Sequence, residues 1–313
     1  MARYLVTGGA GFIGSHTVDR LVADGHQVRA LDDLSSGKLE NLAQVRDQVE
    51  FIKADLREHE AVRAACRGIE YIIHAGAWRS VPKSMEDPVG YTDVNVLATV
   101  NLLDAAAKAK VRRVVNISSS SVYGDTDRMP LREDQPALPI SPYAASKLAT
   151  ELFCDLFTRG FGLETVSVRY FNVFGPRQSL ENEYAVVIPK FVACLLRGES
   201  PPVYGDGSQS RDFTYVDNVV SGTIRASQAP GVSGEVFNIA LGEEHTVLDI
   251  LQELNRIMGV SVKPAFKPHR PGDVKRTFAD SSKAQRLMGW TGTVTFAEGL
   301  RRTVEWFRAH PPG

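Results

Sequence analysis

A tyrosine and a lysine four positions apart have the residue types that proton transfer requires. Tyr143 and Lys147 follow Ser141 and Pro142, which are favoured residues just before and at the start of a helix. Tyr143 should therefore fall in the first turn, and the spacing of four puts Lys147 on the same face. A nearby ammonium group and the positive end of the helix both favour the phenolate. They would lower the pKa of the tyrosine from about 10 toward the range of a general base.

Such a pair also arises by chance on protein surfaces, so its interpretation depends on the segments around it. A strand-like run over 113–118 continues into Ser119, Ser120 and Ser121, which places several hydroxyl groups shortly before the helix. A glycine-rich turn near the N-terminus predicts a binding site for a dinucleotide. With both features present, we interpret Tyr143 as a catalytic residue.

The glycine-rich turn lies between a strand and a helix, the context that a dinucleotide-binding fingerprint requires. Its sequence over 7–14 is Thr-Gly-Gly-Ala-Gly-Phe-Ile-Gly. Gly8 permits a tight turn, Gly11 the close approach of a pyrophosphate, and Gly14 close packing of the helix on the sheet. The N–H groups at the start of the helix, around Phe12 and Ile13, would face the phosphates.

A carboxylate at the end of the second expected strand indicates which dinucleotide binds. Asp32 stands roughly the 20 residues beyond the turn that the fingerprint expects. Its carboxylate would accept hydrogen bonds from both ribose hydroxyls and repel a 2′-phosphate, and no arginine directly follows it. The sequence therefore favours NAD over NADP. Asp55 and Leu56, after the third strand, fit a turn that contacts adenine, although Asp55 could instead cap the next helix.

Short β-branched runs alternate with longer amphipathic segments as far as residue 170, which indicates βαβ crossovers and a parallel sheet covered on both faces. The expected strands are 3–7, 27–32, 49–53, 71–74, 113–118 and 164–169, and the expected helices are 13–24, 58–67, 89–109 and 142–159. We predict an α/β fold, a Rossmann doubly wound parallel sheet with a smaller α/β substrate-binding lobe. The NAD-binding domain would take 1–171, with 219–239 returning to it, and the lobe would take 172–218 and 240–313.

The bulk composition is that of an ordinary globular protein. The 313 residues are 43% hydrophobic and 23% charged, with a formal net charge of −1. Nothing in this balance favours nucleic acid or a membrane surface as a partner. No apolar stretch approaches the ~20 residues of a membrane span, and the N-terminus lacks the regions of a signal peptide, so we expect a cytoplasmic protein. The three cysteines lie far apart and predict reduced thiols and no metal site.

Taken together, the motifs resemble the extended short-chain dehydrogenase/reductase family, in its UDP-hexose 4-epimerase branch. The resemblance runs over essentially the whole chain. It is carried by the glycine turn, His-Ala-Gly-Ala at 74–77, the Tyr143/Lys147 pair, Arg-Tyr-Phe-Asn-Val-Phe-Gly-Pro-Arg at 169–177 and Arg-Asp-Phe at 211–213. It implies an isomerase that interconverts UDP-glucose and UDP-galactose through a 4-keto intermediate, using NAD that it retains. The N-acetylated UDP-hexoses would be a further substrate pair.

The resemblance also implies roles for individual residues. Tyr143 would be the base, and Lys147 would hold the nicotinamide ribose and depress the tyrosine pKa. Ser119, five residues before Gly124, would bridge substrate and tyrosine, with Ser120 assisting. The further cofactor contacts that the resemblance implies are Ala75, Ala77, Asn95 and Tyr170.

For the substrate, Arg211 and Arg270 fall where the family's diphosphate-binding arginines lie, and guanidinium forks suit phosphate geometry. Thr277 falls where some members have a bulky tyrosine, and its small size would leave space for an N-acetyl group. The other implied contacts are Ser80 and Val81 for the hexose, Asn172 for the substrate, Val187, Val203 and Tyr204 for uracil, and Asp273 for a ribose. Each could instead be a salt bridge, a cap or a packing residue.

Three alternatives remain open. A UDP-glucuronate 4-epimerase would use Arg79 or Arg177 to meet a carboxylate. Nucleotide-sugar dehydratases usually carry an Asp-Glu pair after the catalytic hydroxyl, and Ser120-Ser121 at this place disfavours dehydration. The intact catalytic residues disfavour an inactive NAD-binding sensor. The resemblance also implies a homodimer that pairs through the helices at 89–109 and 142–159.

Overall fold

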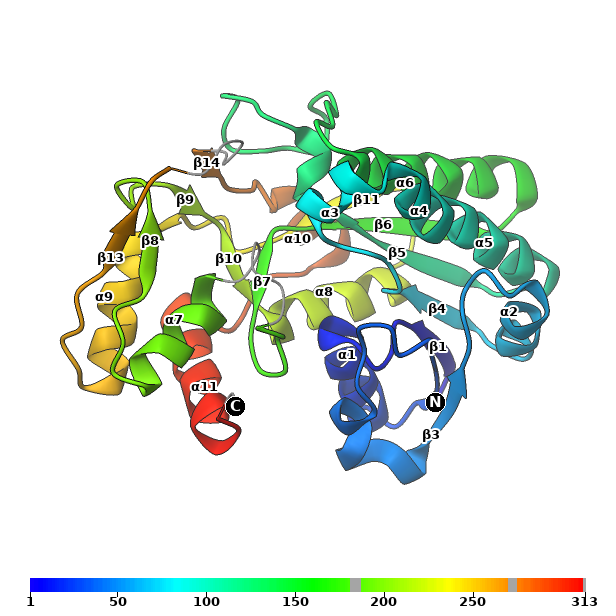
Figure 1. The fold of residues 1–313 in the computed structure, drawn as a ribbon. Helices are drawn as coiled ribbons and strands as arrows, with labels where there is room; N and C mark the ends of the chain where they lie inside the picture. Colours follow the sequence, from blue (N-terminus) through cyan, green and yellow to red (C-terminus); the bar gives the residue numbers. More distant parts are fainter. Residues whose placement is uncertain (181–186, 270–274, 312–313) are drawn as a thin grey trace.

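A seven-stranded parallel sheet forms the centre of the protein. The computed structural model describes residues 1–180, 187–269 and 275–311 (Figure 1). The sheet has the order β11-β6-β5-β4-β1-β2-β3, so the chain starts in the middle and winds outward in both directions. Its strands are β1 (Arg3–Thr7), β2 (Gln27–Asp32), β3 (Val49–Lys53), β4 (Tyr71–His74), β5 (Arg113–Ser119), β6 (Glu164–Tyr170) and β11 (Val236–Ile239). The predicted doubly wound α/β fold is confirmed.

Helices cover both faces of this sheet because its strands are apolar on both sides. In β1, Tyr4 and Val6 pack toward the cluster that holds α1 and α8, whereas Leu5 packs toward the cluster that holds α2, α5 and α6. These helices are α1 (Phe12–Ala23), α2 (His59–Cys66), α5 (Ala98–Lys108), α6 (Pro142–Phe161) and α8 (Val216–Gln228). Figure 1 shows α1 and α8 together on one side and α5 and α6 on the other.

The helix expected over 89–109 is interrupted. It consists of α4 (Pro88–Thr92), a π-helical turn (Asp93–Leu97) and α5, and a short α3 (Val81–Glu86) precedes it. The wide turn places Asn95 inside the protein, where it is 1% exposed and bonds to residues of two other segments. Turns of this kind often mark functional sites. Periodicity alone does not reveal the turn, since apolar residues continue through it.

The second lobe is built from short elements. Its strand pairs are β7 (Asn172–Phe174) with β10 (Phe213–Tyr215), β8 (Pro202–Tyr204) with β13 (Ala265–Lys267), and β9 (Ser210–Arg211) between β12 (His245–Thr246) and β14 (Arg276–Thr277). Its helices are α7 (Val187–Leu196), α9 (Val247–Met258) and α11 (Phe296–Ala309), and α10 (Ser282–Met288) lies against β11. One buried apolar cluster runs from β1 through α8 into α7, α9 and α11, so the two lobes share a core.

The strands β5 and β6 each extend one residue further than the sequence predicts, to Ser119 and Tyr170. These two residues are paired in register at the carboxyl edge of the sheet. In an open α/β sheet this edge is where ligands bind. The added residues therefore stand at the opening of the site.

Candidate active site

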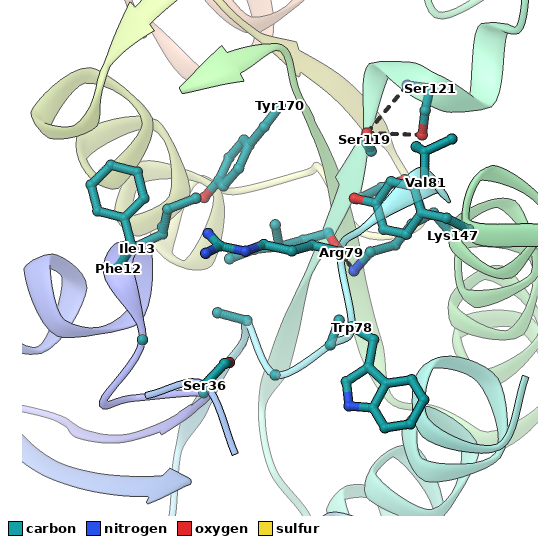
Figure 2. Close-up of a pocket in the computed structure, with 18 of the residues that line it drawn as sticks. Phe12, Ile13, Ser36, Trp78, Arg79, Val81, Ser119, Ser121, Lys147 and Tyr170 are labelled. Carbon is teal, nitrogen blue, oxygen red and sulfur yellow. Dashed lines mark hydrogen bonds between the residues drawn. The ribbon is translucent and has the colours of Figure 1, made fainter. Parts of the chain in front are cut away.

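A cleft of about 1330 Å³ opens at the carboxyl edge of the sheet, between the two lobes (Figure 2). Its walls are the glycine turn, the ends of β2, β4 and β5, the start of α6, and residues of β7, β9 and β14. Within the residues that the structure describes, no group of histidine, cysteine, aspartate or glutamate side chains is arranged to hold a metal ion. Nor is any described helix long and apolar enough to cross a membrane.

The glycine turn has the geometry that the sequence predicts for a phosphate cradle. Gly8 has φ +64°, and a Cβ there would lie 2.7 Å from the backbone nitrogen of Gly76. A Cβ at Gly14 would lie 2.0 Å from the carbonyl oxygen of Gly8, so only glycine permits this packing. Gly11 is the N-cap of α1 and supplies no side-chain cap, which leaves the first N–H groups of α1 available to a ligand in the cleft.

Asp32 lies at the end of β2 and lines the same cleft. Its carboxylate accepts hydrogen bonds from the N–H of Ala10 at 3.0 Å and of Leu34 at 2.8 Å, which fix its orientation. Burial raises the pKa of Asp32, and these two hydrogen bonds oppose that rise.

Asp55 and Leu56 also line the cleft. The Asp55 carboxylate is paired with Arg57 at 2.7 Å, and this hydrogen-bonded partner lowers the pKa of Asp55. The residue before α2 is Glu58, so Asp55 does not cap that helix.

Tyr143 lies in the first turn of α6, where the Oγ of Ser141 accepts a hydrogen bond from the N–H of Ala144 at 3.2 Å. Ser119, at the end of β5, accepts hydrogen bonds from the hydroxyl and N–H of Ser121 at 2.9 and 3.2 Å (Figure 2). A hydrogen bond to Ser119 also lowers the pKa of Tyr143. The tyrosine and the serine therefore face one another across the opening of the cleft.

The structure adds a factor that the electrostatic expectation for Tyr143 did not include, namely burial. Burial raises the pKa of Tyr143 above its usual value, and the groups that oppose this rise are Ser119 and the guanidinium of Arg79. The ammonium of Lys147 instead donates a hydrogen bond to the carbonyl of Ile117 at 2.8 Å. Burial lowers the pKa of Lys147 to about 8, and Glu151 opposes this change. Helix position and spacing alone therefore do not produce a phenolate in the protein itself.

Arg79 is one of the two arginines that the sequence offers as partners for a substrate carboxylate. It lines the cleft, and Figure 2 shows its guanidinium extending toward Ile13 and Tyr170. Among the described residues it forms no ion pair. Arg177, in contrast, is paired with Asp19 of α1 at 2.7 Å and is 13% exposed, so it does not serve the cleft.

The remaining predicted residues divide into two groups. Those that line the cleft are Phe12, Ile13, Ala75, Ala77, Val81, Ser120, Tyr170, Asn172, Tyr204, Arg211 and Thr277. Those that do not are Ser80, Asn95, Val187 and Val203. Val203 is fully buried in the core, and Ser80 is the N-cap of α3. Arg270 and Asp273 lie outside the described residues.

Asn95 does not line the cleft but holds two of the segments that do. Its side-chain carbonyl accepts from the N–H of Trp78 at 2.8 Å, and its amide donates to the carbonyl of Trp78 and to the Oγ of Ser146. It thereby ties the loop after β4 to α6. Other lining residues that the sequence did not indicate are Trp78, Met85, Ile140 and Gln178. They lie mostly on loops or in short elements, and no local pattern marks them.

A family model described as GDP-mannose 4,6 dehydratase matches residues 5–303. The chain belongs to this family, the extended short-chain dehydrogenases/reductases. The resemblance that the motifs indicated is thereby confirmed.

This dehydrogenase/reductase family member is 42% identical to the UDP-glucose 4-epimerase of Mycolicibacterium smegmatis, over 98% of each chain. Its structure matches a UDP-N-acetylglucosamine 4-epimerase from Methanobrevibacter ruminantium, in complex with UDP-N-acetylmuramic acid, with a TM-score of 0.94, 39% identity and 99% of each chain covered. It also matches the Thermus thermophilus UDP-glucose 4-epimerase in complex with NAD, with a TM-score of 0.89, 38% identity, and 98% of this chain and 99% of that one covered.

Proposed function

We propose that this protein is an NAD-dependent 4-epimerase that interconverts UDP-glucose and UDP-galactose, and that it also accepts the N-acetylated UDP-hexoses. The proposal rests mainly on one observation: Tyr143 and Ser119 line the same cleft as the glycine turn and Asp32. Ser120 and Ser121 follow Ser119 on the cleft wall, so the acid and base that a dehydration needs are missing at that place.

The residues on the sheet side of the cleft fit NAD. The uncapped start of α1 offers N–H groups and a partial positive charge to a pyrophosphate. The Asp32 carboxylate, held by two backbone N–H groups, is oriented for a ribose diol and repels a 2′-phosphate. When bound there, NAD would accept a hydride from carbon 4 of the sugar and return it.

The protein's own residues handle the proton. We assign to Tyr143 the removal of the proton of the 4-hydroxyl as the bond between carbon 4 and its hydrogen breaks, which leaves a 4-keto sugar. Ser119 bridges the sugar oxygen and the tyrosine. Once the sugar presents its other face, Tyr143 gives the same proton back to the oxygen. Lys147 would hold the ribose of a bound NAD, and Arg211 would pair with the diphosphate of the substrate.

The open space beside Thr277 supports the N-acetylated substrates. Thr277 lies in β14, its Cα is paired in register with that of Arg211 in β9, and both residues line the cleft. Its side chain is half-buried and ends at the γ atoms. A substituent at carbon 2 of the hexose would find this space if the diphosphate is held at Arg211.

One observation favours a second substrate, UDP-glucuronate. The guanidinium of Arg79 stands in the cleft without an ion pair among the described residues. A carboxylate on carbon 6 of the hexose would satisfy it. Arg177, the other candidate from the sequence, is withdrawn by its pair with Asp19.

We further propose that the enzyme acts in the cytoplasm as a homodimer. Large apolar side chains are exposed on the outer face of α4, the π-helical turn and α6. They are Val89 (78% exposed), Leu97 (59%), Leu152 (58%) and Leu156 (50%). α4 and the π-helical turn both pack against α6, and large exposed apolar side chains on adjoining elements suit a surface that pairs with a copy of itself.

Product analysis tests the proposal. Purified protein is incubated separately with UDP-glucose, UDP-N-acetylglucosamine and UDP-glucuronate, and the nucleotide sugars are separated by anion-exchange chromatography. We expect the 4-epimers of the first two to accumulate to equilibrium. Conversion of UDP-glucuronate alone would favour the second candidate, and a 4-keto-6-deoxy product would show a dehydratase.

A further inference from the structure

A buried ion pair lies one helical turn beyond Lys147, at Glu151 of α6. Glu151 and Arg169 form a double hydrogen bond, from Nε and Nη2 of the arginine to the two carboxylate oxygens, at 2.9 and 2.7 Å. Their side chains are 5% and 6% exposed. Bringing two charges out of water costs free energy, so a buried pair is weak evidence for a stabilising role alone.

The pair is connected to the end of β5. The Oγ of Ser118 donates a hydrogen bond to Oε1 of Glu151 at 2.5 Å. Ile117, Ser118 and Ser119 thus each meet a different residue of α6. The carbonyl of Ile117 accepts from Lys147, the hydroxyl of Ser118 bonds Glu151, and the hydroxyl of Ser119 meets Tyr143. Tyr143, Lys147 and Glu151 are spaced by four residues, so they lie on one face of the helix.

We propose that Glu151 is a positioning residue: together with Arg169 it locks α6 in register with the end of β5 and supplies the anion that faces Lys147. The inference rests on the proposed function, because it concerns the lysine and the tyrosine of that reaction. Glu151 touches neither substrate nor cofactor, since it lies outside the cleft wall.

The charge balance explains why the anion matters. Burial lowers the pKa of Lys147 to about 8, and Glu151 opposes that change. Without this carboxylate, the buried cation Arg169 would lose its ion-pair partner, and the buried cation Lys147 would lose the carboxylate that stabilises its charged form. The lysine would then lose its proton at a lower pH.

The other titratable groups around the pair do not replace it. His74 of β4 is bonded to Thr7 and Thr99, and burial lowers its pKa to about 3, so it is neutral. Burial raises the pKa values of Cys154 in α6 and Tyr123 after β5 to about 12. Glu133 is another carboxylate near Arg169, but burial raises its pKa, and it accepts a hydrogen bond from the N–H of Asn238.

The test compares kcat as a function of pH in wild type and variants. Glu151→Gln should move the alkaline limb of kcat to lower pH by about one unit or more. Because this variant leaves Arg169 buried and unpaired, the double variant Glu151→Gln/Arg169→Met is needed to recover folding. It should keep the shifted limb. Ser118→Ala, which retains the ion pair, should lower kcat about tenfold to a hundredfold at unchanged substrate KM, because it loosens the register of β5 and α6.

A matched control exists in the same two strands. Arg113 and Glu164 join β5 and β6 at their opposite ends, with an Nη2–Oε2 distance of 2.6 Å. Glu164→Gln should change thermal stability without moving the pH profile. Binding of NADH, followed by its fluorescence, reports the same protonation step without turnover.

The outcomes separate the two proposals. Wild-type protein that makes no epimer overturns the proposed function, and the pH dependence of NADH binding still tests the role of Glu151. If the wild-type limb persists in both Glu151 variants, in turnover and in NADH binding, Glu151 has only a structural role and the inference is wrong.

Discussion

Replacing Thr277 by tyrosine should change which sugar the enzyme accepts. Thr277 lines the cleft beside Arg211, on a short strand fixed on β9 by backbone pairing. An aromatic ring at this position would extend into the space that we assign to an N-acetyl group. Overfilling a packed site costs about 1–3 kcal/mol, which corresponds to a loss of roughly five- to 150-fold in kcat/KM. UDP-glucose lacks the N-acetyl group and should be affected much less.

The assay measures kcat/KM for UDP-glucose and UDP-N-acetylglucosamine with wild type, Thr277→Tyr and Thr277→Val. The valine variant is the control, because it keeps the volume of threonine and should change both values little. We expect the ratio of the two specificity constants to fall by the same roughly five- to 150-fold in the tyrosine variant alone. A wild type that does not convert the N-acetylated sugar, or a variant that loses both sugars equally, would refute the reasoning.

Three further predictions address the base, the cofactor and the junction of the lobes. Tyr143→Phe should lower kcat by ~10²–10⁴-fold while the affinity for UDP-glucose, measured by calorimetry, is largely kept; wild-type turnover in this variant would exclude Tyr143 as the base. Asp32→Ala should weaken the preference for NAD over NADP, measured as the ratio of their dissociation constants, and an unchanged ratio would contradict the ribose contact. His16 in α1 bonds the carbonyl of Pro176, and burial lowers its pKa to about 4, so it contributes stability above pH 6.5 that is lost as the pH falls toward 4. Between pH 7 and pH 4, the free energy of unfolding of His16→Gln, measured with denaturant, should therefore fall by about 3 kcal/mol less than that of wild type. An equal fall in both proteins would show that the histidine is not held neutral.

Local signals were sufficient for much of the fold and of the expected site. Strand, cap and helix patterns predict the glycine turn, Asp32 and the first-turn position of Tyr143. Each of these patterns spans only a few residues around the feature that it predicts. The sequence also predicts that residues 219–239 return to the first domain, and β11 within this range pairs with β6 at the edge of the sheet.

The features that the sequence did not reveal depend on tertiary packing. The pairing of Arg177 with Asp19 joins segments over 150 residues apart, and the use of Asn95 to hold Trp78 requires the π-helical turn. The raised pKa of Tyr143 has the same origin, because burial is set by the cleft and not by the spacing to Lys147. Neighbouring residues along the chain carry no sign of these contacts.

Transfer of an isotope at carbon 4 tests the central proposal most directly. The protein as purified is incubated with UDP-glucose that carries deuterium at carbon 4, and the product is analysed by mass spectrometry and NMR. If NAD takes the hydride and returns it within one site, UDP-galactose should form with the deuterium still at carbon 4 and no deuterium lost to solvent. Absence of UDP-galactose, or UDP-galactose that has exchanged the label with water, would contradict the account.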